Sequence, residues 1–101
     1  MNNYKIVIDP GHGGSDSGAT GNGIIEKNLT LDISRYMYDV LKNLGIPVTL
    51  TRNSDETLTP TERVDRILNA YGNSDDVIVI SNHINAGGGD GQSVTNIKYD
   101  N

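Results

Sequence analysis

The sequence predicts an α/β fold: an open, mostly parallel, twisted sheet with helices on its faces. Three short runs of apolar, mainly β-branched residues, at 6–8, 48–51 and 77–80, are typical of buried strands. Two amphipathic segments separate these runs, so the elements follow one another as strand, loop, helix, strand, helix, strand. This alternation favours parallel strands joined by right-handed crossover helices.

The first predicted helix follows a long glycine-rich loop. Asp9-Pro10-Gly11 ends the strand at 6–8, and the loop continues to about Gly23. From Asn28 onward, apolar residues recur at spacings of three and four, which indicates a helix with one apolar face. Gly45 is its expected C-cap, and Pro47 prevents it from continuing. The predicted face consists of Leu29, Ile33, Met37, Val40, Leu41 and Leu44.

The second predicted helix has a clear start signal. Thr59 as N-cap, Pro60 at the first helical position and Glu62 at the third form a capping box. The helix ends at Gly72-Asn73, and its expected apolar face consists of Val64, Ile67, Leu68 and Tyr71. After the strand at 77–80, residues 93–99 alternate weakly, which is typical of an edge strand.

Composition excludes several classes of function. A chain of 101 residues forms one domain, 1–101, and its net charge of −5 argues against nucleic acid as a partner. Because there is no cysteine, a zinc site must use histidine and carboxylate ligands. No stretch is apolar and long enough to span a bilayer, so we expect no membrane insertion.

The chain contains two histidines, and each follows a predicted strand. His12 lies in Gly11-His12-Gly13-Gly14 after the first strand, and His83 follows the strand at 77–80. Ligands of open parallel sheets gather outside the carboxyl ends of the strands, so the two imidazoles are expected at one site. Together with a carboxylate they would form a catalytic metal centre with an open position. Alone, either ring is explained equally well by structural hydrogen bonds.

Three residues are candidates for the carboxylate that completes the site of the two histidines. Glu26 is the first candidate, because it precedes the first helix and can turn back toward the strand ends, although complementing the helix dipole explains it too. Asp9 and Asp16 are the alternatives, and Asp9 is also placed to accept an imidazole N–H. For Arg52 and Arg63, a structural role and contact with substrate explain the sequence equally well.

The motifs around these residues resemble a known family. The sequence is similar to the zinc-dependent N-acetylmuramoyl-L-alanine amidases of the amidase-3 family over about residues 4–91. The similarity is concentrated in Lys5–Gly14, Gly18-Ala19, Glu26–Leu31, Val48–Arg52 and Val79–Ala86, the last of which matches a Ser-x-His-x-Asn-Ala pattern.

This resemblance implies a site and a reaction. His12, Glu26 and His83 match the family's three zinc ligands, and Zn²⁺ is the implied cofactor. A zinc-activated water would hydrolyse the amide between N-acetylmuramic acid and L-alanine of the peptidoglycan stem peptide. The family's domain is longer, and its general base is a Glu in a Glu-Thr-Gly-Phe-like motif that this sequence lacks. We therefore expect a complete metal site in a domain without its C-terminal part, the alternative being a catalytically silent zinc- and wall-binding fragment.

The resemblance also implies a partner and a place of action. Peptidoglycan is the expected partner, and the bacterial cell wall is the expected location. The N-terminus shows no signal-peptide pattern, so phage-type release, mother-cell lysis or trimming of a secreted protein would deliver the chain. A sheet cut after its third or fourth strand has an unpaired edge, through which we expect self-association.

Overall fold

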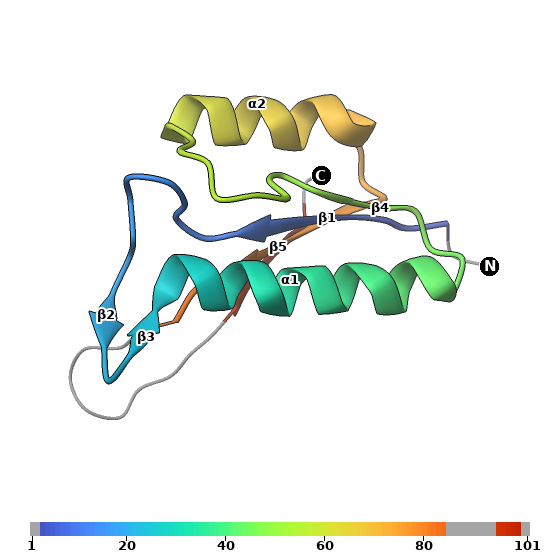
Figure 1. The fold of residues 1–101 in the computed structure, drawn as a ribbon. Coiled ribbons are helices and arrows are strands. Elements are labelled where there is room, and N and C mark those ends of the chain that lie inside the picture. Colours follow the sequence, from blue (N-terminus) through green and yellow to red (C-terminus); the bar gives the residue numbers. More distant parts are fainter. Residues whose placement is uncertain (1–2, 85–94, 100–101) are drawn as a thin grey trace.

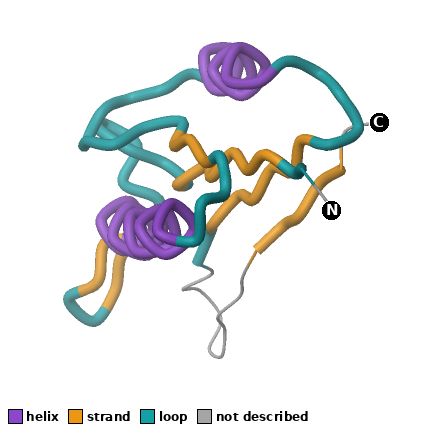
Figure 2. The backbone as a smooth tube through the Cα atoms, turned by 90° about the vertical axis from the view of Figure 1, so that its right-hand side faces the viewer, coloured by secondary structure: helices purple, strands orange, loops and turns teal. Residues whose placement is uncertain are grey.

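The fold has three layers, a sheet between two helices on opposite faces. The computed structural model describes residues 3–84 and 95–99. Helix α1 (Glu26–Asn43) covers one face of the sheet and helix α2 (Pro60–Tyr71) the other, as Figures 1 and 2 show from two directions. This is the open α/β architecture that the sequence predicts. Within the described ranges, no helix is long and apolar enough to cross a bilayer.

The sheet is parallel except at one edge. Strand β1 (Lys5–Pro10) pairs in parallel with β4 (Val48–Leu50) on one side and β5 (Val77–Asn82) on the other, and β6 (Thr95–Tyr99) pairs antiparallel with β5. The edge strand expected from residues 93–99 is present as β6, although residues 93 and 94 lie outside the described part. In spatial order the strands are β4, β1, β5 and β6.

The two central strands extend further than their apolar runs and end level with each other. Asp9 pairs with Ser81 and Pro10 pairs with Asn82, so pairing continues past the β-branched residues. The residues directly after β1 and β5 therefore leave the sheet side by side. This common end places the residues after each strand over one edge of the sheet.

Helix α2 begins and ends as the sequence predicts. Thr59 Oγ1 accepts a hydrogen bond from Glu62 N at 3.1 Å, and Glu62 Oε1 accepts one from Thr59 N at 2.8 Å. Gly72 follows the helix with φ +82°. The predicted apolar face is only partly correct. The chain packs Ile67, Ala70 and Tyr71 against Val7, Val77 and Val79 of the sheet, whereas Val64 and Leu68 are exposed.

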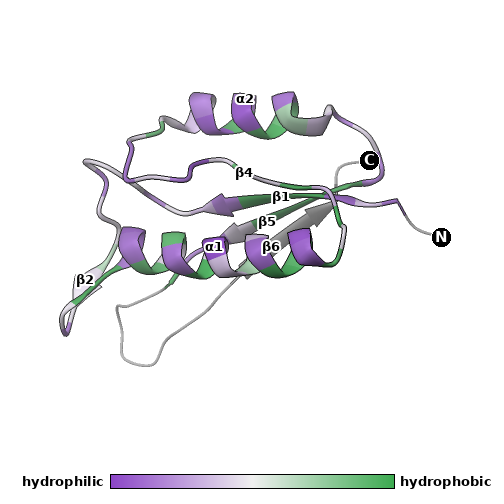
Figure 3. Ribbon diagram, turned by 45° about the vertical axis from the view of Figure 1, so that its right-hand side comes forward, coloured by the Kyte–Doolittle hydropathy of each residue, from purple (hydrophilic) through white to green (hydrophobic). Residues whose placement is uncertain are grey.

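Helix α1 turns a polar stripe, not its most apolar one, toward the site end of the sheet. Thr30 Oγ1 donates to the carbonyl of Gly11 at 2.8 Å, and Ser34 Oγ accepts from Asn82 Nδ2 at 2.8 Å. These contacts set the rotation of the helix, so the predicted apolar face is wrong at Ile33, Val40 and Leu44, which are exposed. In Figure 3 hydrophilic segments recur along both helices, and β1 is hydrophobic along its middle and hydrophilic at its arrowhead.

A short hairpin precedes α1 and was not predicted. Its strands are β2 (Thr20–Gly21) and β3 (Ile24–Ile25), joined by Asn22 at φ 53° and Gly23 at φ 79°. Two consecutive residues with positive φ are typical of a type I′ turn, for which Asn-Gly is the preferred sequence. Because the hairpin runs directly into the helix, α1 begins at Glu26 rather than at Asn28.

Candidate metal centre

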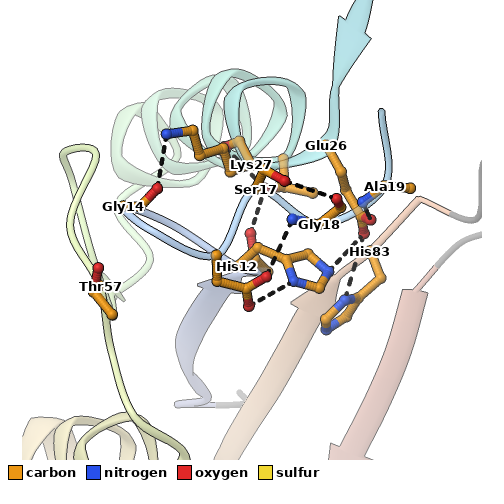
Figure 4. Close-up of polar contacts among 12 residues, drawn as sticks. His12, Gly14, Ser17, Gly18, Ala19, Glu26, Lys27, Thr57 and His83 are labelled. Carbon is orange, nitrogen blue, oxygen red and sulfur yellow. Dashed lines mark hydrogen bonds and ion pairs between the residues drawn. The ribbon is translucent and has the colours of Figure 1, made fainter. Parts of the chain in front are cut away.

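Three residues from distant parts of the chain lie together beyond the carboxyl ends of β1 and β5. His12 Nε2 lies 3.1 Å and His83 Nδ1 lies 3.6 Å from the same oxygen, Oε2 of Glu26. The centroids of the two imidazole rings are 5.1 Å apart, and the ring planes are nearly perpendicular. Figure 4 shows the three side chains directed toward one another from the loop after β1, the start of α1 and the end of β5. The structure thus brings together the three residues that the sequence proposed.

Glu26 is the buried member of the cluster. Only 4% of the residue is exposed, and each carboxylate oxygen accepts a backbone N–H, from Ala19 at 2.9 Å and from Ile84 at 2.7 Å. Burial raises the pKa of Glu26, but the two backbone donors and the neighbouring imidazoles outweigh burial and hold that pKa below its ordinary value. Glu26 therefore carries a negative charge at neutral pH.

Two arginines hold the loop that carries His12 through its carbonyl oxygens. His12 has a φ of +65°, in the left-handed region that residues with a Cβ rarely adopt. Arg63 on α2 donates to the carbonyls of Pro10, at 2.8 Å, and of His12, at 3.2 Å. Arg52 donates to the carbonyl of Gly11 at 2.9 Å. These bonds stabilise the left-handed conformation of the loop. Both arginines therefore have a structural role.

Arg52 also connects the loop to α1. This side chain is almost fully buried, and it donates to the carbonyl of Lys27 at 3.0 Å and of Ser54 at 3.0 Å. Burial lowers the pKa of Arg52 from its ordinary value, although a guanidinium stays charged in proteins. Its Nε is the one buried side-chain nitrogen or oxygen without a hydrogen-bond partner in the described part of the chain.

The outer half of the glycine-rich loop is tied to the loop after β4. Gly14 N donates to Asp55 Oδ1 at 2.7 Å, and Lys27 Nζ donates both to the Gly14 carbonyl and to Asp55 Oδ2, each at 2.9 Å. Ser15 N donates to Thr57 Oγ1 at 2.9 Å. Sequence reasoning missed Lys27, Asp55 and Thr57, because their partners lie in a loop far away in the chain.

The two alternative carboxylates lie outside the cluster. Asp9 was expected to accept an imidazole N–H, but its carboxylate accepts from Thr51, Arg63 and Ser81 at 2.6–3.0 Å. The acceptor beside His12 is Asp16, whose Oδ2 lies 2.9 Å from His12 Nδ1, on the opposite side of the ring from Glu26. Of the three candidates, Glu26 alone joins the two histidines.

The arrangement fits a zinc ion. Zinc binds imidazole nitrogen and carboxylate oxygen at about 2.0–2.2 Å, so tetrahedral ligand atoms lie about 3.3–3.5 Å apart. One ligand atom from each of His12, Glu26 and His83 lies within 4.8 Å of the others, and the two separations from Glu26 Oε2 to the histidine nitrogens are 3.1 and 3.6 Å. Three protein ligands leave a fourth position open, as in catalytic zinc sites.

Comparison with known proteins identifies the family of this chain. Residues 6–99 match the Amidase_3 family, described as N-acetylmuramoyl-L-alanine amidase. The chain is 46% identical over 89 residues to a sporulation-specific N-acetylmuramoyl-L-alanine amidase of Bacillus subtilis (strain 168), covering 86% of this chain and 33% of that protein. It is 45% identical over 89 residues to the amidase CwlM of Bacillus licheniformis, covering 86% of this chain and 34% of that protein.

Solved structures agree. The catalytic domain of the amidase CwlV from Bacillus (Paenibacillus) polymyxa var. colistinus superposes with a TM-score of 0.71 at 34% identity, covering 84% of this chain and 48% of that one. Cwp6 from Clostridium difficile gives a TM-score of 0.75 at 38% identity, covering 87% and 14%. The chain thus spans about a third of the curated relatives above. By sequence and by fold, this chain belongs to the Amidase_3 family of N-acetylmuramoyl-L-alanine amidases.

Proposed function

We propose that His12, Glu26 and His83 bind a zinc ion, and that the chain acts as an N-acetylmuramoyl-L-alanine amidase. One observation carries this proposal: two imidazole nitrogens and a carboxylate oxygen converge at the sheet edge in a chain of the amidase family. The reaction is hydrolysis of the amide between the lactyl group of N-acetylmuramic acid and L-alanine of the stem peptide. Peptidoglycan is then the partner, and the bacterial cell wall is the place of action.

The three residues differ in what they contribute. Glu26 brings the one negative charge of the ligand set and holds it in place through two backbone donors. His12 and His83 bind as neutral imidazoles. His83 is the most exposed of the three, with 46% of its side chain accessible, so the site is open to a polymeric substrate on that side. When bound, zinc activates a water and polarises the scissile carbonyl.

A second candidate function is zinc-dependent wall binding without hydrolysis. It requires only the metal centre and the exposed side of His83, which the described residues supply. A general base contributes roughly 10²–10⁴-fold in rate, so a chain without one would retain affinity for the wall but release little product.

Metal content tests the shared part of both candidates. Elemental analysis after dialysis against chelator and re-addition of zinc should find one zinc per chain. His12→Ala, Glu26→Ala and His83→Ala should each lose it, whereas Asp32→Asn, an exposed carboxylate on α1, should keep it. A chain that takes up no zinc at all would refute the metal centre.

Activity on purified cell walls separates the two candidates. Zinc-dependent release of dye-labelled wall fragments, with new L-alanine amino termini and no new reducing sugar, supports the amidase. Sedimentation of the chain with the walls, without any release, supports the binding function. His12→Ala is the matched control in both assays, because it removes a proposed ligand.

A further inference from the structure

We propose that Asp16 is a positioning residue that keeps the imidazole proton of His12 on Nδ1, so that Nε2 is free to bind the metal. The inference rests on the proposed zinc site. It is carried by one geometric fact: His12 lies between two carboxylates, with Nδ1 2.9 Å from Asp16 Oδ2 and Nε2 3.1 Å from Glu26 Oε2. Only the second nitrogen faces the cluster.

The Asp16 carboxylate is held in place by the backbone. Asp16 exchanges two backbone hydrogen bonds with Gly13, Gly13 N to Asp16 O at 2.8 Å and Asp16 N to Gly13 O at 2.9 Å. Its Oδ1 accepts from Gly18 N at 3.1 Å, which leaves Oδ2 for the ring of His12. The turn therefore aims one oxygen at Nδ1. An ionised carboxylate only accepts hydrogen bonds, so the proton between the two groups belongs to the imidazole.

The two histidines need opposite tautomers. His12 faces Glu26 through Nε2, whereas His83 faces the same oxygen through Nδ1. A neutral imidazole side chain in water prefers its proton on Nε2, which suits His83 but would block the ligating nitrogen of His12. The hydrogen bond at the other nitrogen decides which tautomer a metal-binding histidine adopts. His12 therefore requires an acceptor at Nδ1, and Asp16 supplies it.

The experiment reads the tautomer directly in the metal-free chain. Long-range ¹H–¹⁵N correlation spectra, recorded at a pH where both imidazoles are neutral, report which ring nitrogen carries the proton. Because the chain has two histidines, the spectrum contains two ring patterns, and His83 serves as an internal reference. The variants are Asp16→Ala, Asp16→Asn and the control Asp55→Asn. Asp55 also accepts a backbone N–H of the same loop, at Gly14, but its second oxygen accepts from Lys27 Nζ rather than from the ring.

The expected result is specific to one residue and one ring. In the metal-free native chain both ring nitrogens of His12 face a carboxylate, so part of the population should carry the proton on Nδ1. That fraction should fall in Asp16→Ala, with His83 unchanged. Asp16→Asn should be intermediate, because an amide has one accepting oxygen for two donors, the ring and Gly18 N. Asp55→Asn should leave both rings as they are.

Zinc affinity, measured by competition with a chromophoric chelator, provides a second readout. It should fall about 10–100-fold in Asp16→Ala and stay within about twofold in Asp55→Asn. The inference is overturned if the fraction of His12 that carries its proton on Nδ1 does not fall in Asp16→Ala, or if Asp55→Asn lowers that fraction as much. If the native chain binds no zinc, the proposed function fails, but the metal-free spectra still decide the role of Asp16.

Discussion

Arg63 on α2 donates a 2.6 Å hydrogen bond to the buried carboxylate of Asp9 at the end of β1. The same guanidinium reaches the carbonyls of Pro10 and His12, so one side chain joins the second helix, the central strand and the loop of the candidate site. The ion pair thus couples the stability of the fold to the position of a proposed ligand.

Arg63→Met should be strongly destabilising, because it leaves the Asp9 carboxylate buried without its cation. We expect a loss of about 3 kcal/mol in the free energy of unfolding, measured with urea. The double variant Asp9→Asn, Arg63→Met should lose less than the sum of the single variants, with a coupling of about 1 kcal/mol or more. Lys5→Met, which breaks the half-buried surface pair with Asp76, is the control and should cost below about 1 kcal/mol. Additive single variants would contradict the coupling.

Gly18→Ala should damage the metal centre more than the fold. A Cβ at Gly18 would lie 2.6 Å from Cδ2 of His12 and 2.8 Å from Oε1 of Glu26. Gly45 is a matched control, since its φ of +80° is close to the +70° of Gly18 and no atom lies within 4 Å of its added Cβ. Both variants should lose about 1 kcal/mol or more from backbone strain. Only Gly18→Ala should weaken zinc binding in a chelator competition, and equal affinities would refute the close packing.

Leucine truncations should reveal which face of α1 is buried. Leu31 is 8% exposed, so Leu31→Ala should cost about 2–4 kcal/mol. Leu44 lies on the stripe that the sequence predicted to be buried but is 69% exposed, so Leu44→Ala should stay within about 0.5 kcal/mol. Urea unfolding of both variants measures the difference. Similar losses would mean that the helix is rotated relative to the structure.

Stability should fall with acid because several carboxylates at the surface have lowered pKa values. The hydrogen bond from Lys27 lowers the pKa of Asp55, the Thr59 backbone N–H lowers that of Glu62, and the hydrogen bond from Lys5 lowers that of Asp76. Their ordinary values are 3.8 for Asp and 4.5 for Glu. Below about pH 5 the unfolded chain binds more protons, so stabilisation that is complete above that pH is lost as pH falls through the folded pKa values.

Urea unfolding of the metal-free chain across this range measures the effect. The double variant Glu62→Gln, Asp76→Asn removes two of the three groups and should flatten the decline. A native curve without any decline between about pH 5 and 3 would contradict the lowered pKa values.

Local signals in the sequence predicted most of the fold. The β-branched runs identified β1, β4 and β5, and Thr59-Pro60-Thr61-Glu62 identified the start of α2 through groups that are close in the chain. The hairpin was also within reach, because Asn22-Gly23 is the preferred sequence for its turn. The start of α1 could not be predicted in this way, because its N-cap, Ile25, makes no side-chain hydrogen bond.

The sequence predicted the residues of the candidate site that lie at strand ends. It did not predict the contacts that loops make with these residues. The alignment of β1 with β5 brings His12 near His83, and this follows from the topology alone. The topology does not reveal which aspartate contacts the ring of His12. Asp9 immediately follows the apolar run of β1, yet it turns to Arg63, whereas the backbone exchange with Gly13 brings Asp16 to the ring. Such turns depend on contacts between distant loops, which spacing in the sequence does not reveal.

The position of β5 in the interior of the sheet has a consequence for assembly. His83 reaches the other two ligands only after β5 has paired with β1, because it directly follows that strand. A zinc ion at the site would act as a cross-link between the first and the last of the parallel strands. Zinc would bind only the folded state, because the three ligands meet only there. The apparent zinc affinity would therefore depend on the fraction of the chain in which the sheet has formed.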